Sequence, residues 1–498
     1  MLAFVARRLA LPFAVLAVLG GCTQSPRAPD LAAPLDLAQP ASDLGEPPDL
    51  ASPADLAERL DLTDQPDAAA AETLPALPIV RSQGGVLTTT LRAAPTTVTL
   101  RGQAVPGAFF FNDRSPGAVW RIKPGDRLQV GVENAMAEET NLHFHGFHVS
   151  PEGASDNVFV MVDPGQSLAY DVSVPATHHP GLHWYHPHHH GNSDGQVMGG
   201  LAGLIVVEGG HDQLPGVRGA RERILAYQFW MVDLAGRLNN DLRATMIQTL
   251  NGVEGAELAA YPGEVQFFRL GNVSTMGFLL LRLDGHTMTV LAEDGVPYTT
   301  PEERAELLLP PGKRVEFAVK FGAAGRYVMR NAGYGWGTIT SPTATLATIN
   351  VAGAPRVDAL PTTGVPSAAN AATLAAAPDR KRTVRLSDNA GTWYIDGNAF
   401  DPARVDVQPK LGSVEEWLLV NESLDDHPFH IHINEFAVTK VGAQTLATPR
   451  FQDVVLVKAR SSVTIKQRFA DFTGRFVFHC HVLYHQDRGM MALVEVTP

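Results

Sequence analysis

The residues best equipped for chemistry lie near the C-terminus, in the segment 478–491, which reads FHCHVLYHQDRGMM. In an extended strand successive side chains point to opposite faces, so Cys480 faces one way while His479 and His481 face the other. This short peptide is therefore predicted to contact two metal sites.

Cys480 also has metal-ligand neighbours along the chain. His485 follows it by five residues, and Met490 follows His485 by another five. A thiolate, imidazoles and a weak axial thioether are the ligands of a mononuclear blue copper centre, which requires two histidines. The second imidazole must come from elsewhere, and His427 is the candidate.

Three copies of one unit position these residues. Each copy begins with a glycine turn and has an Asn nine residues after the Gly, and further along a second Gly opens a short aromatic strand. The turns are Pro124-Gly125-Asp126, Pro262-Gly263-Glu264 and Leu411-Gly412-Ser413; the Asn residues are Asn134, Asn272 and Asn421; the second glycines are Gly181, Gly325 and Gly474. Regularly spaced markers of this kind indicate an internal repeat.

Between the markers lie short alternating segments bounded by Gly, Pro, Asn and Asp, without a sustained helical period. This pattern predicts an all-β fold of β-sandwiches. We expect domains at residues 77–210, 220–352 and 382–498, with the Ala- and Pro-rich stretch 354–378 as a surface connection.

The histidines are unevenly distributed over the repeats. Four non-overlapping His-x-His pairs occur, two in the first repeat and two in the third, and Arg330 in the middle repeat stands where the others have a His. The pairs are His143 with His145, His186 with His188, His430 with His432, and His479 with His481. Each pair on a strand places two imidazoles on one face. Imidazole binds copper, zinc, iron or nickel, so the pairs alone do not name the metal. They predict a site at the seam between the outer repeats.

The N-terminus has the features of an export signal. Residues 1–22 contain Arg7-Arg8, an apolar run and the tetrapeptide Leu19-Gly20-Gly21-Cys22, which resembles a lipoprotein cleavage site. We therefore expect export, with a lipid on Cys22 that anchors the chain to a bacterial membrane, in the periplasm or at the cell surface. A plain signal peptide is the alternative, and the apolar run is too short for a transmembrane anchor.

Residues 23–76 differ in composition from the rest of the chain. They repeat Asp-Leu among many Pro and Ala, and they contain 8 Asp and 3 Glu against 2 Arg, much of the acidity behind the formal net charge of −13. Proline and mutually repelling carboxylates keep such a segment unfolded, so it is predicted to be a disordered tether.

The cysteine count argues against disulfides, and the charge distribution argues against a nucleic-acid partner. The chain has only two cysteines, so if Cys22 carries lipid and Cys480 binds metal, none remains for a disulfide. No basic patch indicates a nucleic-acid partner.

Four motifs together resemble those of the three-domain multicopper oxidases, a family that includes laccases, cuprous oxidases and ferroxidases. They are HFHG at 143–146, HPH at 186–188, HPFHIH at 427–432 and HCHVLYHQDRGM at 479–490. The matching organisation covers about 77–498. The resemblance implies a cupredoxin-like Greek-key sandwich for each repeat. It also implies four copper ions, with a type 1 copper in the third domain and a three-copper cluster between the first and third.

The ligand set follows from the resemblance, position by position. The type 1 copper is expected to take His427, Cys480, His485 and axial Met490. The type 2 copper is expected to take His143 and His430. The two type 3 coppers are expected to take His145, His186, His188, His432, His479 and His481.

The implied activity is oxidation of phenolic or other small aromatic reductants in one-electron steps, coupled to four-electron reduction of O2 to water. Electrons would pass from the type 1 copper through Cys480 to His479 and His481. Family members often have Glu directly after the second type 1 histidine, but this chain has Gln486, which cannot titrate. The expected proton source is therefore Asp156, with Asp487 as a second candidate and a solvated loop carboxylate as the alternative for Asp156.

The sequence also fits two other functions. A metallo-oxidase would act on Cu(I) or Fe(II); the 11 Met form no cluster that would bind Cu(I), but Asp425, Asp426 and Asp487 are candidate iron ligands. A copper-free binding protein, like the cell-division relatives in this family, would have lost the ligand set that is intact here.

Overall fold

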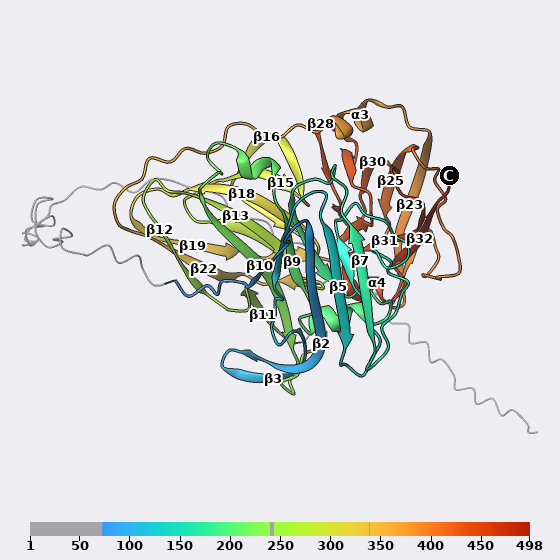
Figure 1. Cartoon of the computed structure of the whole chain (residues 1–498), viewed down its shortest axis with the longest axis horizontal. Coiled ribbons are helices and arrows are strands. Elements are labelled where there is room, and N and C mark those ends of the chain that lie inside the picture. The colour runs from blue at the N-terminus through green and yellow to red at the C-terminus, as the bar shows by residue number, and fades with distance from the viewer. Residues whose placement is uncertain (1–71, 240–243, 338) are drawn as a thin grey trace, which may run out of the picture. The chain divides into compact units, whose positions relative to one another are not determined.

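The computed structural model describes residues 72–239, 244–337 and 339–498. The predicted signal peptide, Cys22 and most of the predicted tether lie outside the described residues. The described chain forms three successive β-sandwiches (Figure 1), so the prediction of an all-β fold with three sandwich domains is confirmed.

The first sandwich pairs a five-stranded sheet, β1-β4-β9-β8-β6, with a four-stranded sheet, β3-β2-β5-β7, around a shared apolar core. Its strands are β1 (Ile79–Arg81), β2 (Val86–Leu100), β3 (Gln103–Phe111), β4 (Val119–Ile122), β5 (Arg127–Asn134), β6 (His143–His145), β7 (Ser167–Ser173), β8 (Gly181–His186) and β9 (Gly203–Val207).

The second sandwich has the sheets β11-β10-β13-β18-β15-β16 and β12-β22-β19-β14-β17, with a separate hairpin β20-β21. Its strands are β10 (Arg221–Val232), β11 (Thr245–Leu250), β12 (Ala256–Ala260), β13 (Val265–Asn272), β14 (Leu279–Leu283), β15 (Met288–Glu293), β16 (Val296–Arg304), β17 (Glu306–Leu309), β18 (Arg314–Lys320), β19 (Gly325–Asn331), β20 (Tyr334–Trp336), β21 (Ile339–Ser341) and β22 (Ala344–Val351).

The third sandwich has the sheets β24-β23-β25-β30-β27-β28 and β29-β26-β31-β32. Its strands are β23 (Arg380–Asn389), β24 (Thr392–Ile395), β25 (Val414–Asn421), β26 (His427–Ile431), β27 (Phe436–Val441), β28 (Gln444–Gln452), β29 (Val454–Val457), β30 (Ser462–Arg468), β31 (Gly474–Cys480) and β32 (Met491–Val496).

The repeated Asn has the same task in each sandwich. It ends β5, β13 and β25, and its side-chain amide donates to two backbone carbonyls while its oxygen accepts from the backbone N–H two residues later. Such Asx turns satisfy backbone groups where the chain leaves the sheet. The Asn that marks the repeat in the sequence thus stabilises the turn at the end of the strand.

Helices are few among the described residues: α2 (Ser193–Met198), α3 (Ala368–Ala375), α4 (Leu483–Gln486) and the 3-10 turn η1 (Gly210–Gln213). The stretch 354–378, expected to be a surface connection, contains helix α3. Its alanines favour helix, and the Ser367 hydroxyl caps it by accepting from Asn370 N at 3.3 Å. Within the described part of the chain, no helix has the length and apolar character needed to span a membrane.

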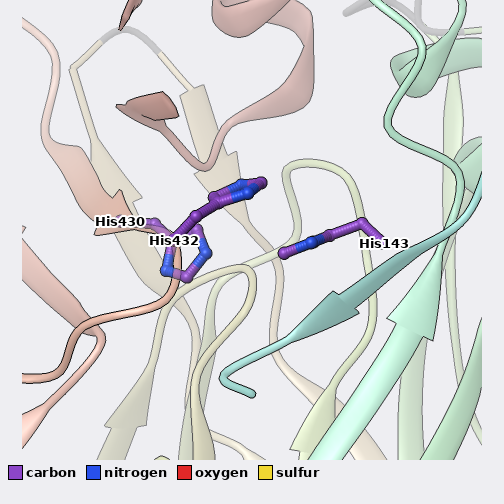
Figure 2. A group of neighbouring side chains, drawn as sticks. All are labelled: His143, His430 and His432. Carbon is purple, nitrogen blue, oxygen red and sulfur yellow. The ribbon is translucent and has the colours of Figure 1, made fainter. Parts of the chain in front are cut away.

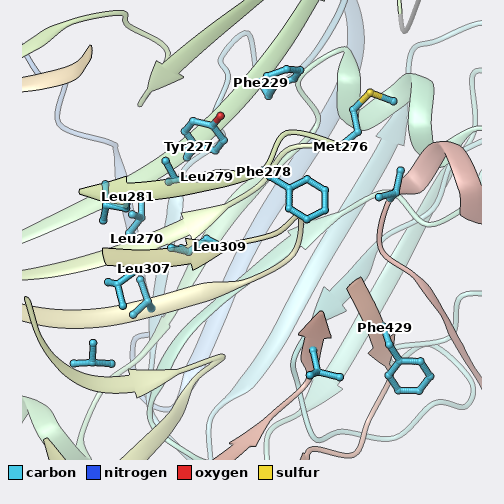
Figure 3. Close-up of a cluster of buried hydrophobic side chains, with 14 of the residues drawn as sticks. Tyr227, Phe229, Leu270, Met276, Phe278, Leu279, Leu281, Leu307, Leu309 and Phe429 are labelled. Atoms are coloured by element: carbon cyan, nitrogen blue, oxygen red, sulfur yellow. The ribbon is translucent and has the colours of Figure 1, made fainter. Parts of the chain in front are cut away.

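One apolar cluster joins the second and third sandwiches. Figure 3 shows part of it, with Leu279, Leu281 and Leu309 from the second sandwich and Phe429 on β26 of the third. The same cluster includes the buried side chains of Cys480 and Met490. The candidate site is therefore built into the core, where the packing of neighbouring residues restricts side-chain rotamers.

The predicted tether extends too far towards the C-terminus. Glu72, within the predicted 23–76 segment, accepts hydrogen bonds from Arg223 Nη1 at 2.9 Å and from Arg221 Nη1 at 3.2 Å, and Thr73 N donates to Glu257 O at 3.0 Å. These contacts fix residues 72 and 73 on the second sandwich. The prediction of disorder up to residue 76 is wrong for this end because composition alone does not reveal a specific ion pair.

Candidate metal centres

Strand pairing brings the His-x-His motifs together. In the first sandwich β6 and β8 are antiparallel with His143 opposite His186, and in the third β26 and β31 are antiparallel with His430 opposite His479. All residues of β6, β8, β26 and β31 except the first two of β31 are buried. The imidazoles therefore lie in the protein interior.

The two outer sandwiches face each other through these strands. Figure 2 shows His143 of the first sandwich directed toward His430 and His432 of the third. The His143 and His432 rings stack with centroids 3.8 Å apart at 12°, and His145 stacks on His430 with the same distance and angle. The structure thus brings together residues nearly 290 positions apart, at the seam that the histidine distribution predicts.

All eight histidines of the four pairs belong to this assembly, which we call the histidine cage. Each is at most 2% exposed. Groups with ligand atoms within 4.8 Å of one another include His143 with His430 and His432, His143 with His145 and His186, and His188 with His432 and His479. His481 is in ring contact with other cage histidines. Its ring centroid lies 4.9 Å from that of His145 and 5.7 Å from those of His186 and His430.

Hydrogen bonds orient the rings of the cage. The Nδ1 atom of His143 donates to Asp156 Oδ1 at 2.9 Å, that of His186 to Pro187 O at 2.8 Å and that of His430 to Asp453 O at 2.9 Å. Their Nε2 atoms have no hydrogen-bond partner although they are buried. A metal-binding histidine donates its other ring N–H in this way, so these unpartnered nitrogens fit metal coordination.

A second set of nitrogens, from three histidines, converges on one point. His479 Nδ1 donates to Cys480 O at 3.1 Å, which leaves its Nε2 as an acceptor. That atom lies 3.1 Å from His188 Nε2 and 3.4 Å from His432 Nε2. Three imidazole nitrogens so close together, at least one of them an acceptor, form a candidate site for a metal cation.

Burial disfavours the charged form of seven cage histidines. Desolvation, and then the neighbouring imidazoles, lower the pKa well below 6.5 for these seven: His143, His145, His186, His188, His432, His479 and His481. Neutral imidazole is the form that binds metal. The cage is therefore ready to accept metal ions at neutral pH.

A second group lies on the other face of β31. Cys480 Sγ is 3.4 Å from His427 Nδ1 and 3.7 Å from His485 Nδ1, and the two Nδ1 atoms are 3.3 Å apart. His427 Nε2 donates to the Ser423 hydroxyl at 2.7 Å, so its Nδ1 is free to coordinate. One sulfur and two nitrogens at these separations match the three strong ligands of a blue copper centre.

Local backbone structure sets this second group. Helix α4 turns the chain after β31 and returns His485 to Cys480, and the loop then brings Met490 back, with Cys480 N donating to Met490 O at 3.1 Å. Cys480 and Met490 are fully buried, and burial raises the pKa of the Cys480 thiol. A metal must therefore displace the thiol proton when it binds.

The carboxylates predicted as proton sources differ in their surroundings. Asp156 is 1% exposed and touches the cage through His143, so its alternative interpretation as a solvated loop residue is wrong. Asp487 accepts from the backbone N–H groups of Gly191 and Asp194 and contacts no cage histidine by a hydrogen bond between described residues. Gln486 is fully buried.

Sequence reasoning missed three residues beside the centres. Asp453 and Arg314 form an ion pair against the cage, and Trp393 stacks on His485 with ring centroids 4.5 Å apart at 14°. None of the three lies in a motif, and no spacing pattern connects them with the ligands. Their roles depend on contacts between distant segments.

The fold and the two groups of side chains define a β-sandwich metalloprotein with histidine and cysteine ligands. Models of multicopper oxidase domains match residues 92–212, 219–354 and 372–498. The chain therefore belongs to the multicopper oxidase family, and copper is the cofactor that membership implies.

Individual relatives agree with this assignment. The chain is 26% identical over 406 residues to a multicopper oxidase of Staphylococcus haemolyticus, covering 78% of this chain and 83% of the relative. It is 25% identical over 459 residues to laccase-1 of Trametes villosa, covering 77% and 84%. The solved structure of a multicopper oxidase of Campylobacter jejuni, described as a metallo-oxidase, superposes with a TM-score of 0.76 at 24% identity, covering 85% of this chain and 95% of that one.

Proposed function

We propose that this chain is a laccase-like oxidase that couples one-electron oxidation of phenolic or other small aromatic reductants to reduction of O2 to water. The observation that carries this proposal is the placement of Cys480: its sulfur lies between His427 and His485, while the adjacent His479 lies in the histidine cage. One peptide thus covalently links a site suited to electron entry with a site suited to O2.

Residues of the two groups would hold four copper ions. His427, Cys480, His485 and Met490 would hold the type 1 ion, and His143 with His430 the type 2 ion. The type 3 pair would be held by His145, His186, His188, His432, His479 and His481. Bound copper would supply the one-electron redox chemistry and the binding of O2, which no protein side chain provides. The chain itself orients the imidazoles, excludes bulk water from them and holds a proton near His143 at Asp156.

The surroundings of His485 favour an aromatic reductant. The residues of the type 1 group are 0–3% exposed, so a reductant cannot rest on them directly. Trp393 is partly exposed and covers the His485 ring, and Tyr484 meets Trp393 edge-on at 5.4 Å. Aromatic side chains at an entry point stack favourably with planar aromatic molecules. The similarity to a laccase supports the same substrate class.

Two of the three predicted iron ligands, Asp426 and Asp487, are engaged in other contacts. The Asp426 carboxylate accepts from Tyr334 Oη at 2.6 Å and Ala459 N at 2.8 Å. Asp487 accepts from two backbone N–H groups at 2.8 and 3.1 Å. These hydrogen bonds disfavour Fe(II) oxidation relative to oxidation of aromatic molecules, and metal-ion oxidation remains the second candidate.

Oxygen uptake tests the assignment. The copper-loaded chain is assayed in parallel with a phenol, Fe(II) and Cu(I), together with copper quantitation and the visible absorbance of the Cu–thiolate bond. We expect blue protein and fastest O2 uptake with the phenol. Faster uptake with either metal ion would establish a metallo-oxidase, and a colourless chain that binds no copper would indicate a binding protein.

Trp393→Leu is expected to impair oxidation of phenols selectively. Leu keeps an apolar cover over His485 but removes the stacking surface, whose contribution of about 0.5–1.5 kcal/mol corresponds to a roughly twofold to tenfold lower kcat/KM for a phenol. Oxidation of Fe(II) should change less, because a hydrated ion gains little from stacking. Tyr394→Leu, on the same strand and without a ring contact to His485 among those described, is the matched control. An equal loss for phenol and Fe(II) would contradict a stacking role.

We also propose that the chain is exported and carries lipid on Cys22. The support is the Leu19-Gly20-Gly21-Cys22 sequence after an apolar run. Metabolic labelling with a radioactive fatty acid in a bacterial host should label the chain, and Cys22→Ser should abolish labelling and release the chain from membranes. Labelling that survives this substitution would contradict the proposal.

A further inference from the structure

The second sandwich contributes no histidine to the cage but places a buried cation against it. Arg314, the first residue of β18, is 0% exposed. Its Nη1 and Nη2 atoms donate to Asp453 Oδ1 and Oδ2 at 2.7 and 2.6 Å, and its Nε donates to Leu182 O at 3.2 Å. Arg314 therefore connects all three sandwiches, since Leu182 lies in the first and Asp453 in the third.

Asp453 carries this connection to the cage. Its Oδ1 accepts from His145 Nε2 at 3.1 Å, and its backbone O accepts from His430 Nδ1 at 2.9 Å. These two histidines come from opposite sandwiches and stack on each other at 3.8 Å. Because Asp453 occupies one nitrogen of each ring, His145 Nδ1 and His430 Nε2 are left unpartnered. One residue thus selects which nitrogen of both rings can coordinate a metal.

The geometry around Gly146 shows how tightly this pair is held. Gly146 has a φ of +84°, and a Cβ there would lie 2.3 Å from Arg314 Nη2 and 2.6 Å from Asp453 Oδ2. The glycine of the HFHG motif is therefore required where Arg314 and Asp453 press against the first ligand strand. A bidentate guanidinium–carboxylate pair fixes both partners in one plane.

We propose that Arg314 of the second sandwich is a positioning residue for the three-copper cluster. It holds Asp453 so that the carboxylate directs His145 Nδ1 inward and the backbone carbonyl directs His430 Nε2 inward. The ligand-free sandwich is thus part of the cluster's supporting structure. This inference rests on the proposed function, which assigns both histidines to copper.

Arg314→Lys tests the inference in the full-length protein. Lys keeps the positive charge but cannot form the two parallel hydrogen bonds. We expect the copper affinity of the cluster, measured by competition with a chelator, to fall about 10-fold to 100-fold, the usual effect of losing a partner behind a metal-binding histidine. The electron paramagnetic resonance signal of type 2 copper should change, while the blue absorbance of type 1 copper should not.

Arg269→Lys is the matched control. Arg269 is another buried arginine of the second sandwich, 1% exposed and paired with Glu316 and Glu222, and no hydrogen bond between described residues joins it to the cage. This variant should keep the cluster affinity and the type 2 signal even if its Tm falls. Asp453→Asn, which removes the negative charge at similar size, should reproduce the selective loss seen in Arg314→Lys.

The possible outcomes distinguish failure of the proposed function from failure of the proposed role of Arg314. A wild-type chain that binds no cluster copper would overturn the proposed function itself. A wild-type chain with normal copper would overturn only this inference if Arg314→Lys bound cluster copper equally well, or if it lost type 1 and cluster copper in parallel. Failure of both Arg314→Lys and Asp453→Asn to fold, while Arg269→Lys folds, would also overturn it, because the pair would then serve folding alone.

Discussion

Cys480→Ser should eliminate the blue absorbance and the oxidase activity while leaving copper in the histidine cage. The serine hydroxyl has nearly the size of the thiol but does not ionise near neutral pH, so the type 1 position loses its one anionic ligand. His427 and His485 remain in place, because the first is held by Ser423 and the second by helix α4. The cage draws only on histidines and should keep its copper.

Copper quantitation, visible absorbance and O2 uptake check this expectation. The variant should bind about one copper ion fewer per chain than the wild type, and its O2 uptake with a phenol should fall to background. Cys22→Ser, the change at the only other cysteine, is the matched control and should keep both the blue colour and the activity. Strong blue absorbance in Cys480→Ser would show that the thiolate comes from elsewhere.

The fold was predictable because its signals are local and repeated. Asn134, Asn272 and Asn421 recur at one spacing from a glycine turn because each ends a strand in the same way. The histidine pairs were equally visible, since alternate residues of a strand share a face. Strand periodicity and ligand chemistry therefore sufficed to predict the sandwiches and the seam where the cage lies.

The supporting residues could not be predicted in this way. Arg314 and Asp453 are 139 positions apart, and their pairing depends on how two sandwiches dock. Trp393 lies on the short strand β24, 92 residues before His485, and stacks on it only because helix α4 returns the chain to that strand. Such contacts have no sequence period, so they appear only when the tertiary structure is known.

The middle repeat illustrates the difference between what the sequence predicts and what the tertiary structure shows. Its sequence lacks histidine pairs, and Arg330, at the position of a ligand in the other repeats, instead forms an ion pair with Asp284. From ligand counting alone this domain has no role in the metal centre. The structure instead places its Arg314 and the turn at Gly312 against the cage, where a Cβ on Gly312 would lie 2.9 Å from the His481 ring.

Asp156→Asn should slow O2 turnover by roughly 10-fold to 100-fold without slowing the reduction of type 1 copper by the reductant. Asp156 accepts from His143 Nδ1 at 2.9 Å and from Phe144 N at 3.0 Å, so it orients the ring that would hold type 2 copper. The Asn amide can still accept one of these hydrogen bonds. It raises the basicity of the imidazole less than Asp does, however, and it cannot transfer a proton to reduced oxygen. Anaerobic bleaching of the blue colour, compared with steady-state O2 uptake, separates the two steps.

The titration of Asp156 gives the same variant a readout that is independent of activity. Burial raises its pKa from 3.8 to about 8, so the folded metal-free chain keeps a proton that the unfolded chain releases. Because the folded state then binds more protons than the unfolded state, this group lowers stability as pH rises from about 4 to 8. The Tm of metal-free Asp156→Asn should therefore fall less over this range than that of the wild type, whereas Asp163→Asn, at an exposed position of the same loop, should match the wild type. Identical pH profiles of Tm for wild type and Asp156→Asn would mean that Asp156 is ionised in the fold, and its role as a proton source would then be contradicted.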